Sequence, residues 1–461
     1  MIRENQQDRT LRRRKLLKDV RNIILPITLQ NLIGAAVNTA DVVMLGLLSQ
    51  TALSASSLAN QITLILLMFF TGLSSGTVIM ASQYYGKGQT GTLRILLGMG
   101  LRVSVLVACI FTALSFFIPR YLMLIYTNDP ALIAAGAEYL RIMGWSFLFM
   151  GVSQIYECII KSMNRAKVAA FFSLAALAVN IVLNAILIFG LCGMPKMGIA
   201  GAAAATVIAR GVECLLCFLD SRKTREFYLI PSLLKEWNHV LFTDFRKYSL
   251  PALGNEFLWG AGFSCYTIVL GHMGSDIVAA NSVVSAARNL CTVFVFGAAY
   301  GTAIIIGNEI GAGRELAARY DARDMLAVVF AASLLAGVIL ILVRPFILDI
   351  TSLTPGAEYD LRIMLYINCV YILGMGMNTT FICGLFRAGG DSRFGLVLDT
   401  VAMWGIFVPL SFVAAFVLKL PALVVYTFIC SDEFFKMPVN LIHYLKDNWV
   451  RNVTRDEAEF S

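Results

Sequence analysis

Charged residues are scarce in this 461-residue sequence, at 14%, and only three histidines are present. A soluble domain has roughly 25% charged and about 45–50% apolar residues. Here 58% of the residues are hydrophobic, and the mean hydropathy is +0.75. This composition excludes a soluble enzyme and is typical of a protein embedded in lipid. The formal net charge of +8 does not by itself indicate nucleic-acid binding, and none is predicted.

Several familiar motifs are missing. The ten cysteines form no disulfide framework, because almost all fall inside apolar runs. The CxxC pair Cys214 and Cys217 has no nearby histidine, so core packing explains it better than a metal site. A P-loop would need a glycine where Ala81 stands and a Ser or Thr after Lys87. We therefore expect no cofactor and no enzyme activity, and an ATP-driven pump, a kinase and a zinc enzyme are excluded.

Long apolar runs dominate the chain. A transmembrane helix needs about 20 apolar residues, and the sequence predicts twelve such spans. They lie near 23–48, 52–84, 95–118, 132–160, 168–190, 198–220, 248–271, 276–310, 325–348, 357–385, 395–416 and 421–445. The predicted fold class is thus an all-α, multi-pass integral membrane protein. We divide it into a basic tail (1–20), a first six-helix lobe (21–220), a linker (221–245), a second six-helix lobe (246–446) and a C-terminal tail (447–461).

Basic residues are unevenly distributed between the two sets of loops. The amino tail, the even-numbered loops and the linker hold most of them, whereas the odd-numbered loops hold four: Arg120, Lys196, Arg344 and Lys419. Cytoplasmic loops collect Lys and Arg. This asymmetry predicts that both termini and the linker are cytoplasmic.

The chain repeats itself at an offset of 225 residues. Leu25, Pro26, Leu45, Gly46 and Gly72 fall without a gap on Leu250, Pro251, Leu270, Gly271 and Gly297. Six spans separate the two copies, so both halves cross the membrane in the same sense. Parallel repeats of this kind are a transporter architecture, in which two bundles move against each other around a substrate.

Ionisable side chains inside a span are costly and are functional candidates by default. Asp41 lies about 22 Å along the first span, counted from Pro26 at 1.5 Å per residue. A carboxyl group buried at that depth can gain and lose a proton as access alternates. The alternative is that Asp41 only hydrogen-bonds a neighbouring helix. Asn38 lies one turn earlier and is a weaker candidate.

Polar residues of the fifth and sixth spans could complete such a site. Asn180 and Asn184 are four residues apart and share one helical face. Thr206 follows a run of small residues, Gly198 to Ala205, which allows close helix approach. These oxygens could form a sodium site or a proton relay with Asp41, or they could simply hydrogen-bond between helices. Both interpretations stay open from the sequence.

The second half is chemically different, because Tyr266 stands where the repeat places Asp41. Glu256 instead lies five residues after Pro251, and it either holds a cation or pairs with Arg246 or Lys247. Asp399 in the eleventh span is a further intramembrane acid. Glu157 and Glu213 most simply pair with Lys161 and Arg210 near helix ends. Prolines inside or at the ends of spans are predicted hinges, and these are Pro26, Pro251 and Pro409.

These segments together resemble the multidrug and toxic compound extrusion (MATE) transporters of the NorM and DinF type. The likeness covers nearly the whole chain. It rests on PITLQNLIGAAVNTADVVMLG from Pro26 to Gly46, on GLSSGTVIMASQYYGKG from Gly72 to Gly88, on Asn180-x-x-x-Asn184 and on GIAGAAAAT from Gly198 to Thr206. The second-half echoes at Pro251, at Gly301 to Gly313 and at Arg387 to Asp391 also fit.

The resemblance implies a V-shaped, monomeric exporter in the bacterial inner membrane, in contact with lipid. It would exchange amphipathic or cationic small molecules for protons or sodium by the rocking of two lobes. In the family, the positions of Asp41, Asn180, Asn184 and Thr206 form a cation site, where a coupling sodium ion would bind. Some members carry Asp where this chain has Asn184, so a single carboxylate remains and proton coupling is favoured.

The resemblance also implies a second-lobe site. NorM-type members pair a seventh-span Glu, which Glu256 resembles, with an Asp in the tenth span. Here the tenth span holds only Asn368 and Asn378. We therefore assign Glu256, Tyr266, Asn378 and Asp399 to a substrate site or second cation site. The alternative function is a lipid-linked saccharide flippase of the same superfamily, for which Arg210 and Arg288 would be the candidate basic residues. A receptor or assembly factor without transport fits least.

Overall fold

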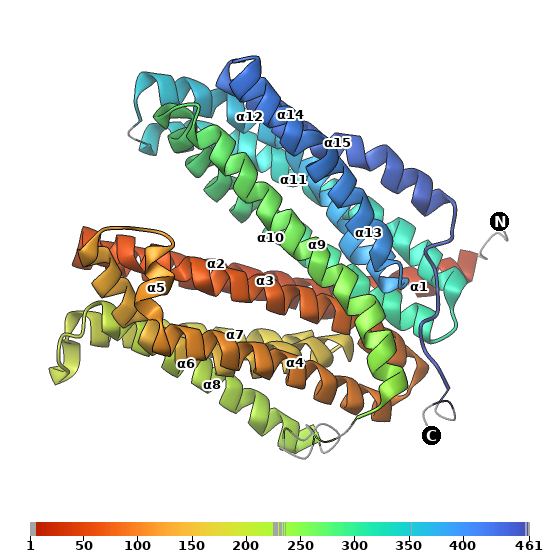
Figure 1. The fold of residues 1–461 in the computed structure, drawn as a ribbon. Helices are drawn as coiled ribbons and strands as arrows, with labels where there is room; N and C mark the ends of the chain where they lie inside the picture. Colours follow the sequence, from red (N-terminus) through yellow and green to blue (C-terminus); the bar gives the residue numbers. More distant parts are fainter. Residues whose placement is uncertain are drawn as a thin grey trace. The chain divides into compact units, whose positions relative to one another are not determined.

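The computed structural model describes residues 6–224, 229, 233, 235, 237–351, 353–456 and 459, and these contain helices and no β-strand. Figure 1 shows long helices connected mostly by short loops. Parts of the predicted linker and of both predicted tails lie outside the described residues. The all-α fold class predicted from composition is therefore confirmed.

Twelve helical rods account for the predicted spans within the described residues. Six belong to the first half: α2 (Leu25–Leu48), α3 (Gln50–Lys87), α4 (Thr90–Phe117), α6 (Pro130–Ser162), α7 (Ala166–Phe189) and α8 (Ile199–Thr224). Six belong to the second half. Four of them are α9 (His239–Gly271), α10 (Ser275–Gly311), α11 (Glu315–Ile350) and α15 (Ala422–Leu445). The other two are continuous rods made of several elements: α12 (Pro355–Thr379) with η4 (Thr380–Phe386), and α13 (Ser392–Asp399) with η5 (Thr400–Phe407), α14 (Val408–Phe412) and η6 (Val413–Val417). Ten of the twelve are long and apolar enough to cross a membrane, and the other two are α9 and α15.

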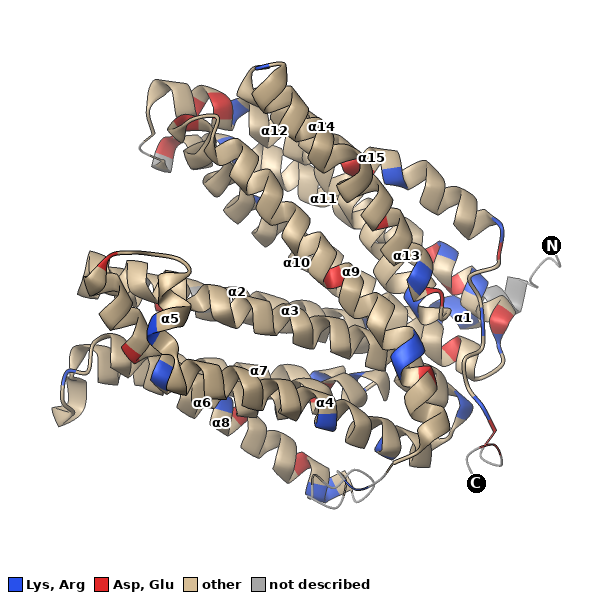
Figure 2. Ribbon diagram, viewed as in Figure 1, with Lys and Arg blue, Asp and Glu red and all other residues tan. Residues whose placement is uncertain are grey.

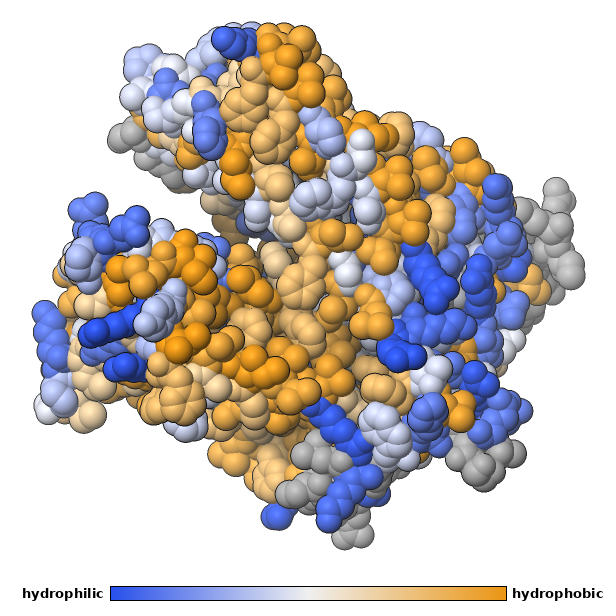
Figure 3. All heavy atoms as spheres, in the orientation of Figure 1, coloured by the Kyte–Doolittle hydropathy of each residue, from blue (hydrophilic) through white to orange (hydrophobic). Residues whose placement is uncertain are grey.

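The surface of these helices fits a lipid environment. Large apolar side chains such as Leu47, Leu106, Phe117 and Phe346 are 63–76% exposed. Figure 3 shows apolar residues covering the sides of the helices, with hydrophilic residues gathered mainly near their ends. Charged residues are likewise concentrated near helix ends in Figure 2, with few along the middle of the rods. An exposed apolar face of this size needs lipid to cover it.

The chain forms two compact units. Unit 1 is Met1–Thr28, Val78–Gly88 and Lys247–Arg455, and unit 2 is Leu29–Thr77, Gln89–Arg246 and Asp456–Ser461. In unit 1, α12 packs against α10, α11 and α15, and in unit 2, α8 packs against α6 and α7. Most of each unit is one half of the repeat. The start of α2 and the end of α3 nevertheless belong to unit 1. The two units are therefore not separated by a single chain boundary near residue 220.

Two short helices appear where no span was predicted. α1 (Gln6–Asp19) occupies the predicted basic tail, and α5 (Pro119–Leu124) follows α4. Arg12 binds Asp321 and Asp324 of α11, and Lys15 binds Glu309 of α10. The helices also reach into the predicted linker, since α8 continues to Thr224 and α9 already begins at His239.

All three predicted hinge prolines lie inside helical rods. Pro26 follows the π-helical turn η1 (Val20–Ile24), Pro251 lies inside α9, and Pro409 follows the π-helical η5. A proline removes a backbone hydrogen bond, and π-helical turns interrupt the regular ladder. Pro26 and Pro409 thus lie next to π-helical turns, whereas α9 continues as α-helix through Pro251. Motion about them stays a prediction.

Candidate functional site

The polar residues predicted around Asp41 lie together in unit 2. Asp41 comes from α2, Asn180 and Asn184 from α7, and Thr206 from α8. Asn180, Asn184 and Thr206 are buried, at 2%, 0% and 8% exposed, while Asp41 is half-buried. A Cβ atom at Gly201 would lie only 2.6 Å from the Leu187 carbonyl oxygen, so the small-residue run lets α8 approach α7 closely. That approach places Thr206 beside Asn180.

Their hydrogen bonds run in two directions from the Asn184 amide, one to the Asp41 carboxylate and the other through Asn180 to Thr206. The Thr206 hydroxyl donates to the Ala202 carbonyl oxygen, at 3.1 Å, and accepts from Asn180 Nδ2, at 3.3 Å. Asn184 Nδ2 donates both to Asn180 Oδ1, at 3.1 Å, and to Asp41 Oδ1. Asn184 Oδ1 is buried and accepts no hydrogen bond. Asn38 lies in α2 near this group, but its side chain is outside the described residues.

A second polar network lies nearer the start of α2. Glu157 is 3.4 Å from Lys161, and Glu213 is 2.8 Å from Arg210, so both predicted ion pairs are confirmed. Gln30 Nε2 donates to Glu157 at 2.5 Å and to Ser173 at 2.8 Å. This network joins four helices of unit 2 and pairs its buried charges.

Unit 1 contains a cavity of about 60 Å³ among its helices. Three predicted residues, Glu256, Asn378 and Asp399, line it. Its remaining walls combine aromatic, small and polar side chains: Asn255, Trp259, Phe296, Tyr300, Thr379, Ile382, Cys383, Glu433 and Lys436. Ile382 and Cys383 belong to the π-helical η4, a kind of distortion common at functional sites. Tyr266 does not line the cavity. It lies 3% exposed in the apolar core of the unit.

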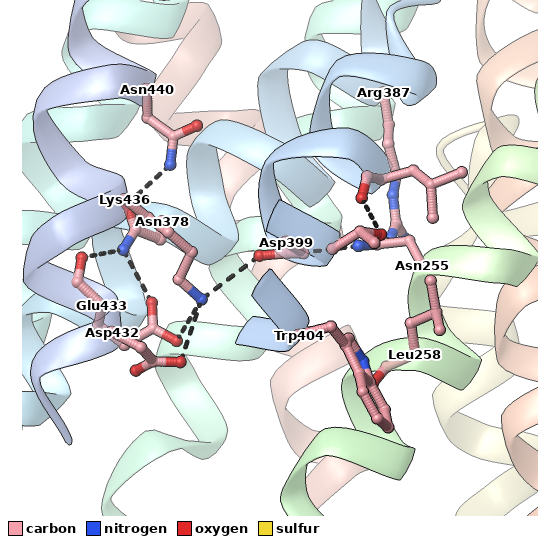
Figure 4. Close-up of polar contacts among 12 residues, drawn as sticks. Asn255, Leu258, Asn378, Arg387, Asp399, Trp404, Asp432, Glu433, Lys436 and Asn440 are labelled. Atoms are coloured by element: carbon pink, nitrogen blue, oxygen red, sulfur yellow. Dashed lines mark hydrogen bonds and ion pairs between the residues drawn. The ribbon is translucent and has the colours of Figure 1, made fainter. Parts of the chain in front are cut away.

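Lys436 of α15 is the centre of the charged wall of this cavity. Its ammonium lies 2.9 Å from Glu433, 3.3 Å from Asp399 and 3.7 Å from Asp432. Figure 4 shows the lysine reaching from α15 toward Asp399, with Asp432 and Glu433 on its own helix. The Lys436 side chain is 2% exposed, and the three carboxylate side chains are at most 8% exposed. Three carboxylates therefore share one buried cation.

Arg387 and Glu256 form a separate pair on another wall. Arg387 NH1 donates to Glu256 at 2.9 Å, and Arg387 NH2 donates to Asn255 Oδ1 at 2.6 Å. Asn255 Nδ2 in turn donates to Asp399 Oδ2 at 2.6 Å. The partner of Glu256 is thus Arg387, and the predicted pairing with Arg246 or Lys247 is wrong.

Asn378 connects the tenth span to α15. Its Nδ2 donates to the backbone oxygen of Glu433, at 2.5 Å, and to Glu433 Oε2, at 2.8 Å, while its Oδ1 accepts from Asn440 at 2.8 Å. Buried polar groups of this kind are normally hydrogen-bonded. The second-half acid next to the tenth span therefore comes from α15, not from α12.

Sequence reasoning missed Asp432, Glu433, Lys436 and Arg387 as site residues. A usable signal was present, because three ionisable residues lie within five positions inside the apolar run 421–445. Positions 432, 433 and 436 share one helical face through spacings of three and four. The tenth span itself contributes no acid, as the sequence indicates, and the grouped carboxylates of the second half come from α13 and α15 instead.

Comparison with known proteins follows the same two-fold division. The MatE family model matches the chain twice, over residues 26–186 and 251–413. The matches begin 225 residues apart, which is the repeat offset found in the sequence.

Relatives extend over most of the chain. An uncharacterized transporter, YisQ of Bacillus subtilis, is 22% identical over 93% of this chain and 90% of its own length. The multidrug resistance protein PmpM of Pseudomonas aeruginosa is 22% identical over 88% and 85%. A probable multidrug resistance protein, NorM of Agrobacterium fabrum, is 25% identical over 85% of each chain.

Solved structures agree on the fold. A MOP superfamily transporter from Pyrococcus furiosus has a TM-score of 0.84 at 16% identity, covering 93% of this chain and 95% of its own. An outward-facing multidrug resistance MATE family transporter has a TM-score of 0.81 at 18% identity, covering 93% and 95%. With the family model matching both halves, this chain belongs to the MATE family of multi-pass membrane transporters.

Proposed function

We propose that this protein is a secondary antiporter that exports organic cations and amphipathic drugs in exchange for protons. The observation that carries the proposal is the buried amide of Asn184, which donates to the Asp41 carboxylate and also to Asn180, and Asn180 in turn donates to Thr206. It holds one half-buried acid inside a span, where an ionisable group needs a functional explanation. The export direction and the drug class rest on the relatives named for multidrug resistance.

The geometry around Asp41 favours a proton over sodium. Hard cations bind carboxylate, carbonyl and water oxygens. Here the nearest partner of Asp41 is the Asn184 NH₂ group, a donor that stabilises an ionised carboxylate. When Asp41 takes up a proton, its hydroxyl can instead donate to Asn184 Oδ1, which accepts no hydrogen bond in this structure. Both protonation states thus have a partner without a metal ion.

The unit 1 cavity is the proposed substrate site. Trp259, Phe296 and Tyr300 offer aromatic faces, and Asp399 and Glu433 offer carboxylates. Aromatic faces and carboxylates together recognise organic cations. Loading of Asp41 and of this cavity would alternate as the two halves of the repeat move against each other.

The remaining expectations belong to the same proposal. The basic loops support a bacterial inner-membrane protein whose termini and central linker are cytoplasmic, and we propose that it acts as a monomer. The flippase alternative needs basic residues free to bind a pyrophosphate. Arg210 is instead paired with Glu213, and Arg288 hydrogen-bonds Asn368 at 3.3 Å. These contacts favour the antiporter.

Transport in proteoliposomes tests this function. Ethidium movement is followed under an imposed pH gradient and, separately, under a sodium gradient, for the wild type and for Asp41→Asn. We expect movement under the pH gradient alone, and at least a ten-fold loss in the variant, because the amide cannot exchange a proton at this position. Movement only under the sodium gradient would overturn proton coupling, and undiminished movement in the folded variant would exclude Asp41.

A further inference from the structure

The charges on the α15 wall of the unit 1 cavity do not balance. Asp399, Asp432 and Glu433 face the single ammonium of Lys436 within 3.7 Å. Arg387 does not correct the imbalance, because it is engaged by Glu256 at 2.9 Å. Burying an unpaired charge is strongly unfavourable. With all three carboxyl groups ionised, the wall would carry more negative than positive charge, which a bound proton or an additional cation would offset.

Two carboxylate oxygens on this wall are buried and accept no hydrogen bond. They are Oδ1 of Asp399 and Oδ1 of Asp432. Glu433, in contrast, is fully engaged, since Lys436 donates to its Oε1 and Asn378 to its Oε2. Oδ1 of Asp399 faces the Lys436 ammonium at 3.3 Å, and Asp399 also lines the cavity, so a cationic group that enters there meets this oxygen together with the lysine. A cationic group is the natural partner for it.

Lys436 already occupies the position that such a group would take. An ammonium has three N–H donors, and the three carboxylates surround this one. The lysine also lines the cavity together with Asp399 and Glu433. Its four-carbon stem is flexible, so the ammonium can withdraw toward Asp432, on its own helix, when another cation enters.

We propose that the Lys436 ammonium is a resident cation of the unit 1 cavity, and that the cationic group of a transported molecule competes with it for Asp399 and Glu433. This inference rests on the proposed function for the class of molecule that enters. In the absence of substrate the lysine is the cation that these carboxylates share. A bound ammonium or other organic cation takes over part of that role, while its apolar portion contacts Trp259, Phe296 and Tyr300.

Removing the lysine should therefore strengthen binding instead of weakening it. In Lys436→Gln the repulsion between a substrate cation and the resident ammonium is gone. At a separation of a few ångströms, a unit-charge repulsion is large even at an effective dielectric constant of about 20. We expect ethidium to bind the purified, detergent-solubilised variant at least about ten-fold more tightly than the wild type, measured by fluorescence polarisation without any ion gradient.

Two matched variants decide whether the gain arises at this wall. Lys436→Gln with Asp399→Asn should return the affinity toward the wild-type value, because the freed carboxylate is gone. Lys161→Gln removes a lysine paired with Glu157 in unit 2, and it should bind ethidium as the wild type does. Unchanged or weaker binding by folded Lys436→Gln, or a gain that survives Asp399→Asn, overturns the proposal.

If Lys436→Gln does not fold, a second comparison tests the same proposal with a double variant that has the net charge of the wild type. Lys436→Gln with Asp432→Asn removes one positive and one negative charge, and it is compared with Asp432→Asn alone. We expect the double variant to bind ethidium more tightly than the single one, and equal affinities overturn the proposal. Because no gradient is used, a failure of Asp41 coupling leaves these affinities unchanged, so the two failures are distinguishable.

Discussion

Asn184 is the residue on which the proposed preference of the Asp41 site for a proton over sodium depends. Its amide donates to Asp41 and to Asn180, and it lies fully buried at 0% exposed. A carboxylate at this position would place two acids side by side and remove the donor. Two adjacent carboxylates cannot both stay ionised without a cation or a shared proton.

The variant Asn184→Asp should therefore gain a response to sodium. With two carboxylates and the hydroxyl of Thr206 nearby, oxygen ligands replace the amide donor, which suits a hard cation. We expect sodium to raise the thermal stability of the purified variant by a few degrees and to leave the wild type unchanged. Thermal unfolding at constant ionic strength, with potassium replacing sodium, measures this.

The matching control restores a single carboxylate. Asp41→Asn combined with Asn184→Asp keeps one acid and one amide, exchanged between α2 and α7. A sodium response equal to that of Asn184→Asp alone would show that the paired carboxylates are not its cause. It would also remove the geometric argument for a proton in the wild type.

At the scale of helices, the approach of α8 to α7 depends on the absence of a side chain at Gly201. A Cβ atom there would lie 2.6 Å from the Leu187 carbonyl oxygen, a distance that forces the backbones apart. Gly201→Ala should therefore destabilise unit 2 by about 1–3 kcal/mol, in the range of overpacked cores. It should also reduce transport, because it separates Thr206 from Asn180.

Gly211, in the same helix, supplies the control. A Cβ atom there would meet Phe149 at 3.7 Å, an ordinary contact. Gly211→Ala should leave stability unchanged or raise it by up to about 1 kcal/mol, since alanine favours a helix more than glycine does. Thermal unfolding of both variants compares them directly. Equal stabilities would mean that α7 and α8 adjust without cost.

The sequence predicts the positions of the helices better than it predicts the contacts between their side chains. Every predicted span corresponds to a helical rod, because a long apolar run in lipid has to satisfy its backbone internally. The residues around Asp41 could be named in advance, since each lies alone in an apolar segment. The spacing of Asp432, Glu433 and Lys436 could have been found in the sequence, whereas only tertiary packing shows that Asp399 of α13 belongs with them. Glu256 was mispaired for the same reason, since Arg387 is 131 residues away.

At the scale of the whole chain, the two halves of the repeat match the same family model but have different polar residues at their candidate sites. The Asp41 site of unit 2 has one carboxylate that accepts from an amide, whereas the cavity wall of unit 1 has three carboxylates around a lysine. The 225-residue offset predicted the two similar halves, and the two family matches confirm it. It could not predict the chemistry, because Tyr266 stands where the repeat places Asp41. The matched positions quoted for the repeat are leucine, proline and glycine, whereas the acids of the two candidate sites do not match.

The segment after α15 is also part of the folded protein, although the sequence predicted only a tail from residue 447. Trp449 is fully buried, and Gln83 of α3 donates to the carbonyl oxygens of Ala388 and Arg451 at 2.7 and 3.0 Å. Gln83 Oε1 accepts from the Val453 N–H at 2.7 Å. The segment thus joins the end of α3 to the loop after η4, all within unit 1.

Deleting residues 447–461 should therefore destabilise unit 1, whereas deleting residues 457–461 should not. Loss of a buried tryptophan alone costs about 3–5 kcal/mol, and Gln83 would lose two of its three hydrogen bonds. We expect the longer deletion to lower the thermal unfolding temperature of the purified protein by several degrees. The shorter deletion keeps all of these contacts and should unfold with the wild type. If both truncated proteins unfold at the wild-type temperature, the segment adds no stability to the helices that it contacts.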